Sequence, residues 1–396
     1  MAGCSFAGLE ETEANVARAV ELLCKIQTNA FYSYDADVGQ VAIFLEPTLA
    51  MANHSCVPNA LVQFVGRKAV LRAERPIAEG DEIEISYTDY TAPLSKRQDA
   101  LASYCFKCQC PRCSDDLNVY QVAAAKLVEA APSGLGLVAD LSSRLRRHPA
   151  VVDSDKQTLA RTVGDSATML MGEQPMADPR DTPEQRRGVL SAQYRDCASL
   201  VDAGLWAVTP VPEMVTEISI YYAEQGDFAP ALALACLVAT ECDPYRYLAF
   251  FHPARAKTLL MIAKLLANTA EGTAKLVDTV VAVSKQVTVG QKVQDALQDI
   301  DQVSLCQMLL LMILRLSPDG LAAEWETATA AREMLRDIEQ LPGREKEVSL
   351  IRAWTTDPAE GQSQAFFDYA VVQQVSALAS LGRAILQVDF GSNARA

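Results

Sequence analysis

The chain has 396 residues, of which half are hydrophobic and about a fifth are charged, and its formal net charge is −15. This length allows two or three domains with sizeable buried cores. The acidic balance excludes direct nucleic-acid binding of the usual basic kind. No apolar run approaches the ~20 residues that a membrane helix needs, and the N-terminal stretch has no secretory signal. The eleven cysteines are irregularly spaced and odd in number, which favours a reducing compartment, cytoplasm or nucleus, over a disulfide framework.

The N-terminal part of the chain predicts a helix followed by a strand. Between Glu10 and Gln27, apolar residues recur at three- and four-residue spacing, which is typical of an amphipathic helix. A turn-like stretch at 35–39 follows. Val41–Leu45 is then a short apolar run bounded by Pro47, which predicts a buried strand.

The next elements predict a hairpin, a further strand and a short helix. Ala60–Val65 and Lys68–Glu74 are β-rich runs separated by Gly66-Arg67, the pattern of a two-residue hairpin. Ile83–Tyr87 alternates in the manner of a strand. Leu94–Ser103 is charged and then apolar, which indicates a short helix leading into a group of cysteines.

Beyond Asp116 the sequence is rich in Ala and Leu with helical periodicity, interrupted by a predicted loop at Gly172–Arg187 and by several prolines. Ile220–Ala239 predicts two helices joined by a tight turn at Gly226-Asp227-Phe228. This is the form of one tetratricopeptide (TPR) helix pair, which buries its apolar face by stacking on neighbours. No strict repeat period is present. Further helices are predicted at His252–Leu266, Ser304–Leu316, Ala322–Glu339 and Ala370–Leu386.

The charge is distributed unevenly along the chain. Residues 53–113 carry eight Lys or Arg and seven Asp or Glu, so nearly all of the acidic excess lies elsewhere. An acidic surface around a neutral core can attract a lysine-rich peptide. The alternative is that the acidic surface only keeps the protein dissolved.

The spacing of the cysteines predicts a metal site. Three of them fall within six residues, and soft sulfur ligands at such spacing suit tetrahedral Zn²⁺. A fourth ligand must come from elsewhere, and Cys56, in a loop-like stretch bounded by Pro58, is the candidate. Metal binding would then clamp two distant parts of the chain, so its free energy would become folding free energy. His54 is an alternative ligand, Cys105 competes for the triplet, and buried structural thiols are the alternative to a metal. The predicted ligands are Cys56, Cys108, Cys110 and Cys113.

Several other residues do not indicate a function when each is taken alone. A lone histidine such as His54 is more often structural than catalytic, and Tyr87 would by default be a half-buried aromatic with a bonded hydroxyl. Phe31, Tyr104 and Phe106 would by default belong to a core. The functional interpretation depends on their order and spacing.

Three motifs occur in order: NHSCVPN at Asn53–Asn59, GDEIEISYTDY at Gly80–Tyr90 and YCFKCQCPRC at Tyr104–Cys113. Together they resemble the C-terminal half of a SET domain and its post-SET zinc segment, and are most similar to those of the SET-and-MYND (SMYD) lysine methyltransferases. The resemblance covers the chain from about Asn29 to Cys113. Helical C-terminal domains of TPR type also occur in that family, and His252–Leu265 looks like a segment of one.

The resemblance implies an α+β fold. A partial SET-domain β-fold with a post-SET zinc site would be followed by an all-α TPR-like helical domain. The expected parts are a helical insert-region remnant (1–28), the C-terminal half of the SET domain (29–92), the post-SET zinc segment (93–116) and the TPR-like domain (117–396).

The resemblance also implies an activity, a protein-lysine N-methyltransferase that uses S-adenosylmethionine. Its substrate would be a lysine-containing protein or peptide, either a histone tail of chromatin or a non-histone protein. Tyr87 matches the catalytic tyrosine. The other matched positions are Asn53, His54 and Phe106 for binding S-adenosylmethionine, Phe31, Tyr104 and Asn29 for the substrate lysine channel, and Cys56, Cys108, Cys110 and Cys113 for Zn²⁺.

Two parts of the family pattern are not found in this sequence. One is the MYND zinc finger, and the other is the strand whose Gly-x-Gly element wraps the methionine end of the cofactor. We therefore expect either a piece of a longer protein or a shortened family member that begins inside the insert region. The alternative function is a catalytically inactive, zinc-stabilised interaction protein that uses the helical domain as its binding surface. Oligomeric state and degree of methylation are not specified by the sequence.

Overall fold

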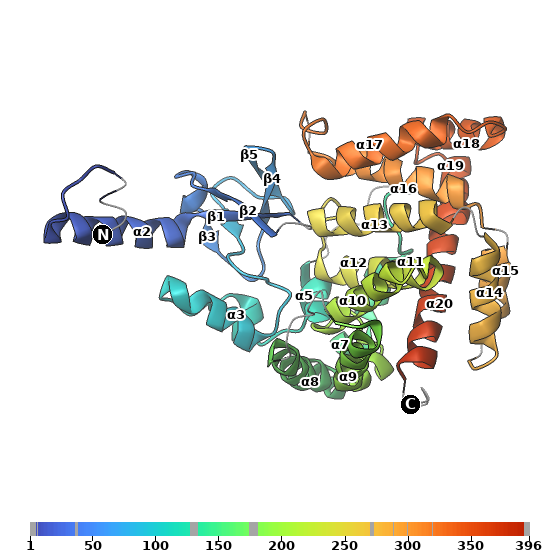
Figure 1. Ribbon diagram of the computed structural model, residues 1–396, viewed down its shortest axis with the longest axis horizontal. Coiled ribbons are helices and arrows are strands. Elements are labelled where there is room, and N and C mark those ends of the chain that lie inside the picture. Colours follow the sequence, from blue (N-terminus) through green and yellow to red (C-terminus); the bar gives the residue numbers. More distant parts are fainter. Residues whose placement is uncertain are drawn as a thin grey trace. The chain divides into compact units, whose positions relative to one another are not determined.

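The chain divides into two compact units. Unit 1 holds Met1–Tyr90 and Ser95–Ser114, and unit 2 holds Thr91–Leu94 and Asp115–Ala396. Short strands occur in unit 1 and helices make up unit 2, so the predicted α+β class is confirmed (Figure 1). The structure is a computed structural model that describes residues 5, 7–35, 39–126, 134–173, 181–269, 273–287, 289–298, 300–318 and 320–391.

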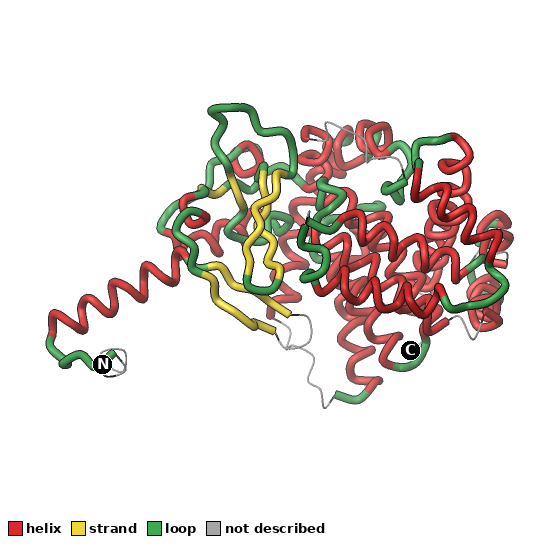
Figure 2. Tube along the Cα trace, turned by 90° about the horizontal axis from the view of Figure 1, so that it is seen from above, coloured by secondary structure: helices red, strands yellow, loops and turns green. Residues whose placement is uncertain are grey.

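Unit 1 contains the strands of the described residues, paired as three two-stranded sheets (Figure 2). The first and third of these sheets are antiparallel and the second is parallel. The pairs are β1 (Phe31–Asp35) with β2 (Gly39–Phe44), β3 (Asn53–His54) with β6 (Glu84–Ile85), and β4 (Ala60–Val65) with β5 (Lys68–Ala73).

The β4–β5 hairpin has the predicted form. Its register runs from Ala60 opposite Ala73 to Val65 opposite Lys68. Gly66 begins the turn with φ of 55°, a left-handed conformation that glycine adopts without steric cost. Because the turn holds only two residues, it fixes the register in which β4 and β5 pair. Strand β4 also contacts β6.

Three expectations about the elements were wrong. The strand predicted at Val41–Leu45 is present as β2, but it is not buried, because Ile43 and Leu45 are more than half exposed. Strand β1 was not predicted, and residues 36–38 of the expected turn lie outside the described residues. The strand predicted at Ile83–Tyr87 shrinks to β6, because its partner β3 is itself two residues long. The loop predicted at Gly172–Arg187 ends early, because Thr182 and Gln185 form a capping box that starts a helix at Pro183.

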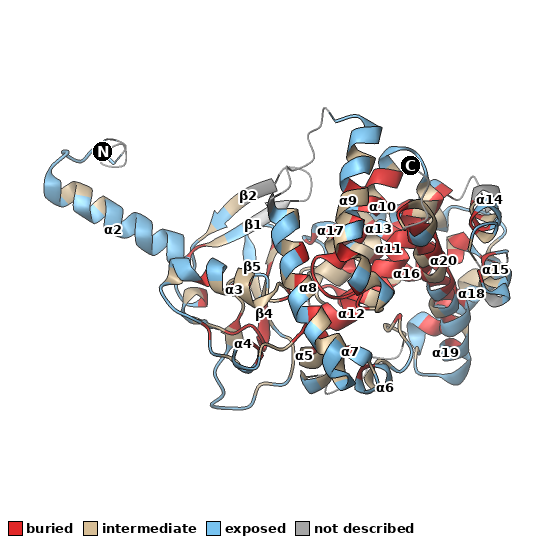
Figure 3. Cartoon of the chain, turned by 90° about the horizontal axis from the view of Figure 1, so that it is seen from below, coloured by how far each residue is buried: buried red, intermediate tan, exposed pale blue. Residues whose placement is uncertain are grey.

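The helices of unit 1 lie before, between and after these strands along the chain. The predicted N-terminal helix is confirmed as α2, and it begins where the Thr12 side chain accepts a hydrogen bond from the Asn15 N–H (3.2 Å). None of its residues is buried, as Figure 3 shows. The helical elements are α2 (Glu13–Asn29), η1 (Leu49–Met51), α3 (Leu94–Leu101), η2 (Ala102–Tyr104) and α4 (Pro111–Ser114).

In the part of unit 2 that the structure describes, every regular element is helical. No helix among the described residues combines the length and the apolar character needed to cross a membrane. The elements are α5 (Val119–Lys126), α6 (Leu141–Arg146), α7 (Pro149–Val152), α8 (Ser154–Glu173), α9 (Pro183–Asp202), α10 (Val211–Glu224), α11 (Phe228–Leu237), η3 (Val238–Cys242), α12 (Asp243–Arg246), α13 (Pro253–Thr269), α14 (Thr273–Ser284), α15 (Gln291–Gln298), α16 (Gln302–Leu316), α17 (Glu326–Glu339), α18 (Glu345–Thr356), α19 (Gly361–Phe367), η5 (Asp368–Gln373) and α20 (Gln374–Asp389).

Helix α11 lies in the core of unit 2. It is almost wholly apolar and buried, and it packs against α10, α13 and α20. The turn predicted before it is present, with Gly226 at φ of 77°. Helix α20 approaches it so closely that a Cβ atom on Gly382 would lie 2.6 Å from the carbonyl oxygen of Ala233. The predicted α10–α11 helix pair is therefore a real packing unit of this core.

Candidate metal centre and adjoining aromatic site

Asn59 joins the hairpin to strand β6. Its side chain donates to the carbonyl of Glu82 (2.8 Å) and accepts from the N–H of Glu84 (2.8 Å), and its own N–H donates to the Glu84 carbonyl (3.1 Å). Asn59 is buried, where such polar groups need partners. These bonds hold β6 beside β3 and so bring two distant motifs together. Asn59 was not predicted to have a role, although it lies in the first motif.

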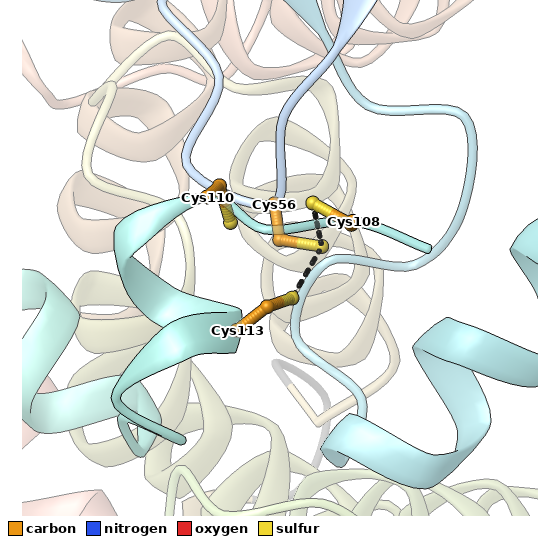
Figure 4. A group of neighbouring side chains, drawn as sticks. All are labelled: Cys56, Cys108, Cys110 and Cys113. Carbon is orange, nitrogen blue, oxygen red and sulfur yellow. Dashed lines mark hydrogen bonds between the residues drawn. The ribbon is translucent and has the colours of Figure 1, made fainter. Parts of the chain in front are cut away.

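The four cysteines of the predicted metal site point towards one another (Figure 4). Their sulfurs all lie within 4.8 Å of one another. The Cys56 sulfur is 3.5 Å from that of Cys113 and 4.0 Å from that of Cys108. A tetrahedral zinc site with Zn–S bonds of ~2.3 Å has sulfur–sulfur edges of about 3.8 Å. The donor set therefore fits Zn²⁺, whereas Cys105, the alternative, is exposed.

Helix α3 supports the loop that carries the cysteine triplet. The Gln98 side chain donates to the Cys108 carbonyl (2.9 Å) and accepts from the Cys108 N–H (3.2 Å). The Cys110 carbonyl then accepts from the N–H groups of Cys113 and Ser114, both at 2.9 Å, which starts the single turn of α4. Two short helices thus fix the loop from both sides.

Two buried arginines lie beside the sulfurs. Arg97, 1% exposed, donates from Nη2 to the Cys113 sulfur at 3.5 Å. Arg112, 3% exposed, donates to the Tyr90 carbonyl. Burial and the charge of Arg97 lower the pKa of Arg112 to about 10, and the charge of Cys56 opposes this shift. A Zn²⁺ ion with four thiolates carries a net charge of roughly −2, which these cations would offset. Sequence reasoning missed both residues, although Arg112 stands inside the cysteine motif.

The thiols also perturb one another. The Cys56 thiol donates to the Cys110 sulfur, and this bond lowers the pKa of Cys110 to about 4. The same bond, with burial, raises the pKa of Cys56. Within the cluster, Cys110 is therefore the residue held as a thiolate, the form that binds a metal.

An aromatic cluster adjoins the cysteines. The His54 ring centroid lies 5.2 Å from that of Tyr87 and 5.9 Å from that of Phe106, and Tyr87 lies 4.9 Å from Tyr104. Burial raises the pKa of both Tyr87 and Tyr104, so each hydroxyl stays protonated at neutral pH. Burial also lowers the pKa of His54. Phe106 is 38% exposed.

Tyr87 is held at both of its ends. Its hydroxyl donates to the carbonyl of Ala52 (2.6 Å), and its backbone N–H donates to Nδ1 of His54 (3.0 Å). Because the hydroxyl proton is committed to Ala52, the phenol oxygen can act only as an acceptor towards a further group. This is the arrangement needed to receive N–H or polarised C–H groups.

The remaining predicted residues have other contacts. The exposed Asn53 side chain donates to Oε1 of Glu82 (2.5 Å). Asn29 donates back to the carbonyl of Lys25 in its own helix (2.7 Å). Phe31 packs against Phe64, with ring centroids 6.3 Å apart. The structure therefore brings Tyr104 and Phe106 to His54 and Tyr87, while the Asn29 and Phe31 side chains contact other parts of unit 1.

Strand β1 presents a further candidate that the sequence analysis did not name. Burial is the main cause of the raised pKa of the Tyr104 hydroxyl, and Tyr32, the neighbour of Phe31, is close enough to add to it. Tyr32 is 39% exposed. Because neighbouring residues of a strand point to opposite faces, Tyr32 and Phe31 cannot both face Tyr104.

Comparison with known proteins finds similarity over the N-terminal part of this chain. Residues 8–88 match the model of the SET domain. The histone-lysine N-methyltransferase SMYD3 of Mus musculus is 37% identical over 94 residues, which are 24% of this chain and 22% of that protein. The N-lysine methyltransferase SMYD2-A of Xenopus laevis is 38% identical over 99 residues, 25% of this chain and 23% of that protein.

The match covers about a quarter of each of these curated relatives. The SMYD2 protein of Mus musculus is likewise 36% identical over 110 residues, 27% of this chain and 25% of that protein. The similarity predicted from the three motifs is thus confirmed for the SET region.

Proposed function

This chain carries a SET-domain segment of the SMYD type, and from that premise we propose that it is a protein-lysine N-methyltransferase that uses S-adenosylmethionine. The observation that supports this most is the convergence of His54, Tyr87, Tyr104 and Phe106 beside the four sulfurs. These residues come from three separate motifs, and the fold joins them in one place.

The cofactor would bind against Asn53, His54 and Phe106. The exposed Phe106 ring offers a stacking face for an adenine. The Asn53 amide lies at the exposed end of β3, where it can exchange its bond with Glu82 for one to a ligand. When bound, S-adenosylmethionine supplies an electrophilic methyl group.

Tyr87 and Tyr104 would form the wall of the lysine site, with Phe31 and Asn29 as further proposed members. Aromatic walls exclude water and so favour the neutral amine, which is the nucleophile. They also tolerate a methylated, cationic product through their π faces. The acceptor oxygen of Tyr87 would align the amine for in-line attack. Most of the rate gain would come from this alignment.

Zn²⁺ would be held by Cys56, Cys108, Cys110 and Cys113 as a structural ion. The substrate class is a lysine-containing protein or peptide, histone or non-histone, which the acidic remainder of the chain would attract. The TPR-like character of unit 2 and a location in cytoplasm or nucleus belong to the same proposal. A catalytically inactive interaction protein is not favoured, because the curated relatives named above are all methyltransferases.

The test begins with calorimetric titration of the zinc-loaded chain with S-adenosylmethionine, followed by transfer of labelled methyl groups to a panel of histone and lysine-rich peptides. Tyr87→Phe should reduce transfer at least ~100-fold, because it removes a group that acts near the reacting atoms. Tyr369→Phe, at an exposed position, is the matched control and should change nothing. A folded, zinc-loaded chain that neither binds the cofactor nor methylates any peptide would refute the proposal.

A further inference from the structure

One imidazole ring links the metal centre to the tyrosine. Nε2 of His54 lies 3.2 Å from the sulfur of Cys56. On the other side of the ring, Nδ1 accepts the backbone N–H of Tyr87 at 3.0 Å. Because the ring is rigid, these two contacts couple the position of the sulfur to that of the Tyr87 backbone.

The hydrogen bonds determine which ring nitrogen carries the proton. A backbone N–H can only donate, so Nδ1 must present its lone pair to Tyr87. In the neutral ring the proton is then on Nε2, and it faces Cys56. The Cys56 sulfur must accept this hydrogen bond, as a metal-bound thiolate does.

The same short segment holds the tyrosine at its other end. Ala52 accepts the Tyr87 hydroxyl, and Ala52 and His54 flank Asn53 in the chain. Both anchors of Tyr87 therefore lie within four residues of Cys56. The position of the phenol oxygen depends on where this segment is held, and Cys56 is the residue of the four-cysteine site that lies in it.

We infer that His54 is a positioning residue through which the bound metal sets the place of Tyr87. His54 donates from Nε2 to the metal-bound sulfur of Cys56 and orients Tyr87 through Nδ1. Partners of this kind around metal ligands contribute about 10- to 100-fold to metal affinity. The inference rests on the proposed function only in treating Tyr87 as catalytic. Its tests measure the contacts between the metal, His54 and Tyr87, and they require no methyl transfer.

The histidine count makes the linkage measurable. The chain has three histidines, so ring-¹⁵N labelling of the full zinc-loaded chain gives three sets of signals. His148 and His252 are internal controls in unit 2, where each accepts a backbone N–H at Nδ1, from Ala150 and Ala254 respectively, at 3.2 Å. All three rings should show the Nε2–H form. When Zn²⁺ is exchanged for ¹¹³Cd²⁺, only the His54 Nε2–H signal should shift and show coupling to the metal.

The second measurement follows the tyrosine. In ¹⁵N-tyrosine-labelled protein, the Tyr87 amide signal is the one that Tyr87→Phe removes. Exchange of zinc for cadmium should shift this signal together with His54, and it should leave the tyrosine amides of unit 2 in place. Comparison of two metal-loaded states avoids any unfolding that metal removal would cause.

Two variants separate the bridge from simple packing. His54→Gln keeps one acceptor and one donor, whereas His54→Phe keeps the ring volume and loses both. Zinc release to a chelator should be at least ~10-fold faster in His54→Phe than in the parent chain, with His54→Gln between them.

The inference is wrong if the zinc-loaded His54 carries its proton on Nδ1, if its signal is indifferent to the metal, or if the Tyr87 amide does not move with it. Equal zinc release from both variants and the parent would also overturn it, as would a chain that holds no metal.

Discussion

The close crossing of α20 over α11 makes Gly382→Ala a quantitative test of the helical unit. An added Cβ would lie 2.6 Å from the Ala233 carbonyl oxygen. Ordinary contact begins near ~3.4 Å, so the two backbones must part by about 0.8 Å. Overpacking of this kind costs up to about 3 kcal/mol. The better helix propensity of alanine returns about 1 kcal/mol, which leaves a net loss of about 2 kcal/mol.

Gly188→Ala in α9 is the matched control, because nothing lies within 4 Å of its Cβ position. It should gain about 1 kcal/mol from propensity alone. All three tryptophans, Trp206, Trp325 and Trp354, are buried in unit 2, so urea unfolding followed by tryptophan fluorescence reports on that unit. With a slope of about 3 kcal/mol/M, the midpoint should fall by about 0.7 M in Gly382→Ala and rise by about 0.3 M in Gly188→Ala. Equal rises in both variants would refute the packing argument.

Three further variants test unit 1. Cys110→Ser should lose zinc by elemental analysis and loosen residues 104–116 in hydrogen exchange; retained stoichiometric zinc would remove Cys110 from the site. Asn59→Ala should cost about 1–3 kcal/mol, because the Glu82 carbonyl and the Glu84 N–H, which form part-buried hydrogen bonds with its side chain, lose their partner; an unchanged exchange rate at the Glu84 amide would contradict this. Burial raises the pKa of Glu74 to about 7, so the protonated acid favours the fold, and stability should fall as pH rises from about 4.5 to about 7. Glu74→Gln removes this dependence on pH. At pH 8 the amides of β4 and β5 should be better protected from hydrogen exchange in the variant than in the parent chain, by up to about 3 kcal/mol, whereas at pH 5 the two proteins should be alike. An equal difference between the two proteins at both pH values would show that Glu74 does not titrate in this range.

The elements that sequence reasoning predicted well are those specified by local rules. The β4–β5 hairpin follows from a two-residue glycine turn between β-rich runs. The α10–α11 pair follows from helical periodicity interrupted at Gly226. In both cases the information lies within about twenty residues of chain. The capping box at Thr182 was also available locally, and it was overlooked inside a stretch that otherwise resembled a loop.

The elements predicted poorly depend on distant partners. Strand β1 is recognisable only once β2 is known to pair with it. The length of β6 is set by β3, about thirty residues away in sequence. Local composition contains neither piece of information. This is why the strand predicted at Ile83–Tyr87 was too long, and why Tyr87 lies after the strand rather than at its end.

The same distinction applies to the site. Spacing and motif order indicated the four cysteines, and the structure brings their sulfurs together. Neither spacing nor motif order indicates the residues that hold them, such as Gln98 on the Cys108 backbone or Arg97 on the Cys113 sulfur. Their side chains are of ordinary types in an ordinary amphipathic helix, and only the fold shows what they contact.

His54 shows how much a correct motif leaves undetermined. From the sequence alone, three interpretations of His54 remained open: a zinc ligand, a cofactor contact or a structural histidine. The Tyr87 N–H, 33 positions further along the chain, occupies Nδ1 and thereby points the proton of Nε2 at Cys56. A ring that donates to the sulfur cannot at the same time offer that nitrogen to the metal. The positioning role that we propose for His54 thus rests on one backbone hydrogen bond that no sequence pattern contains.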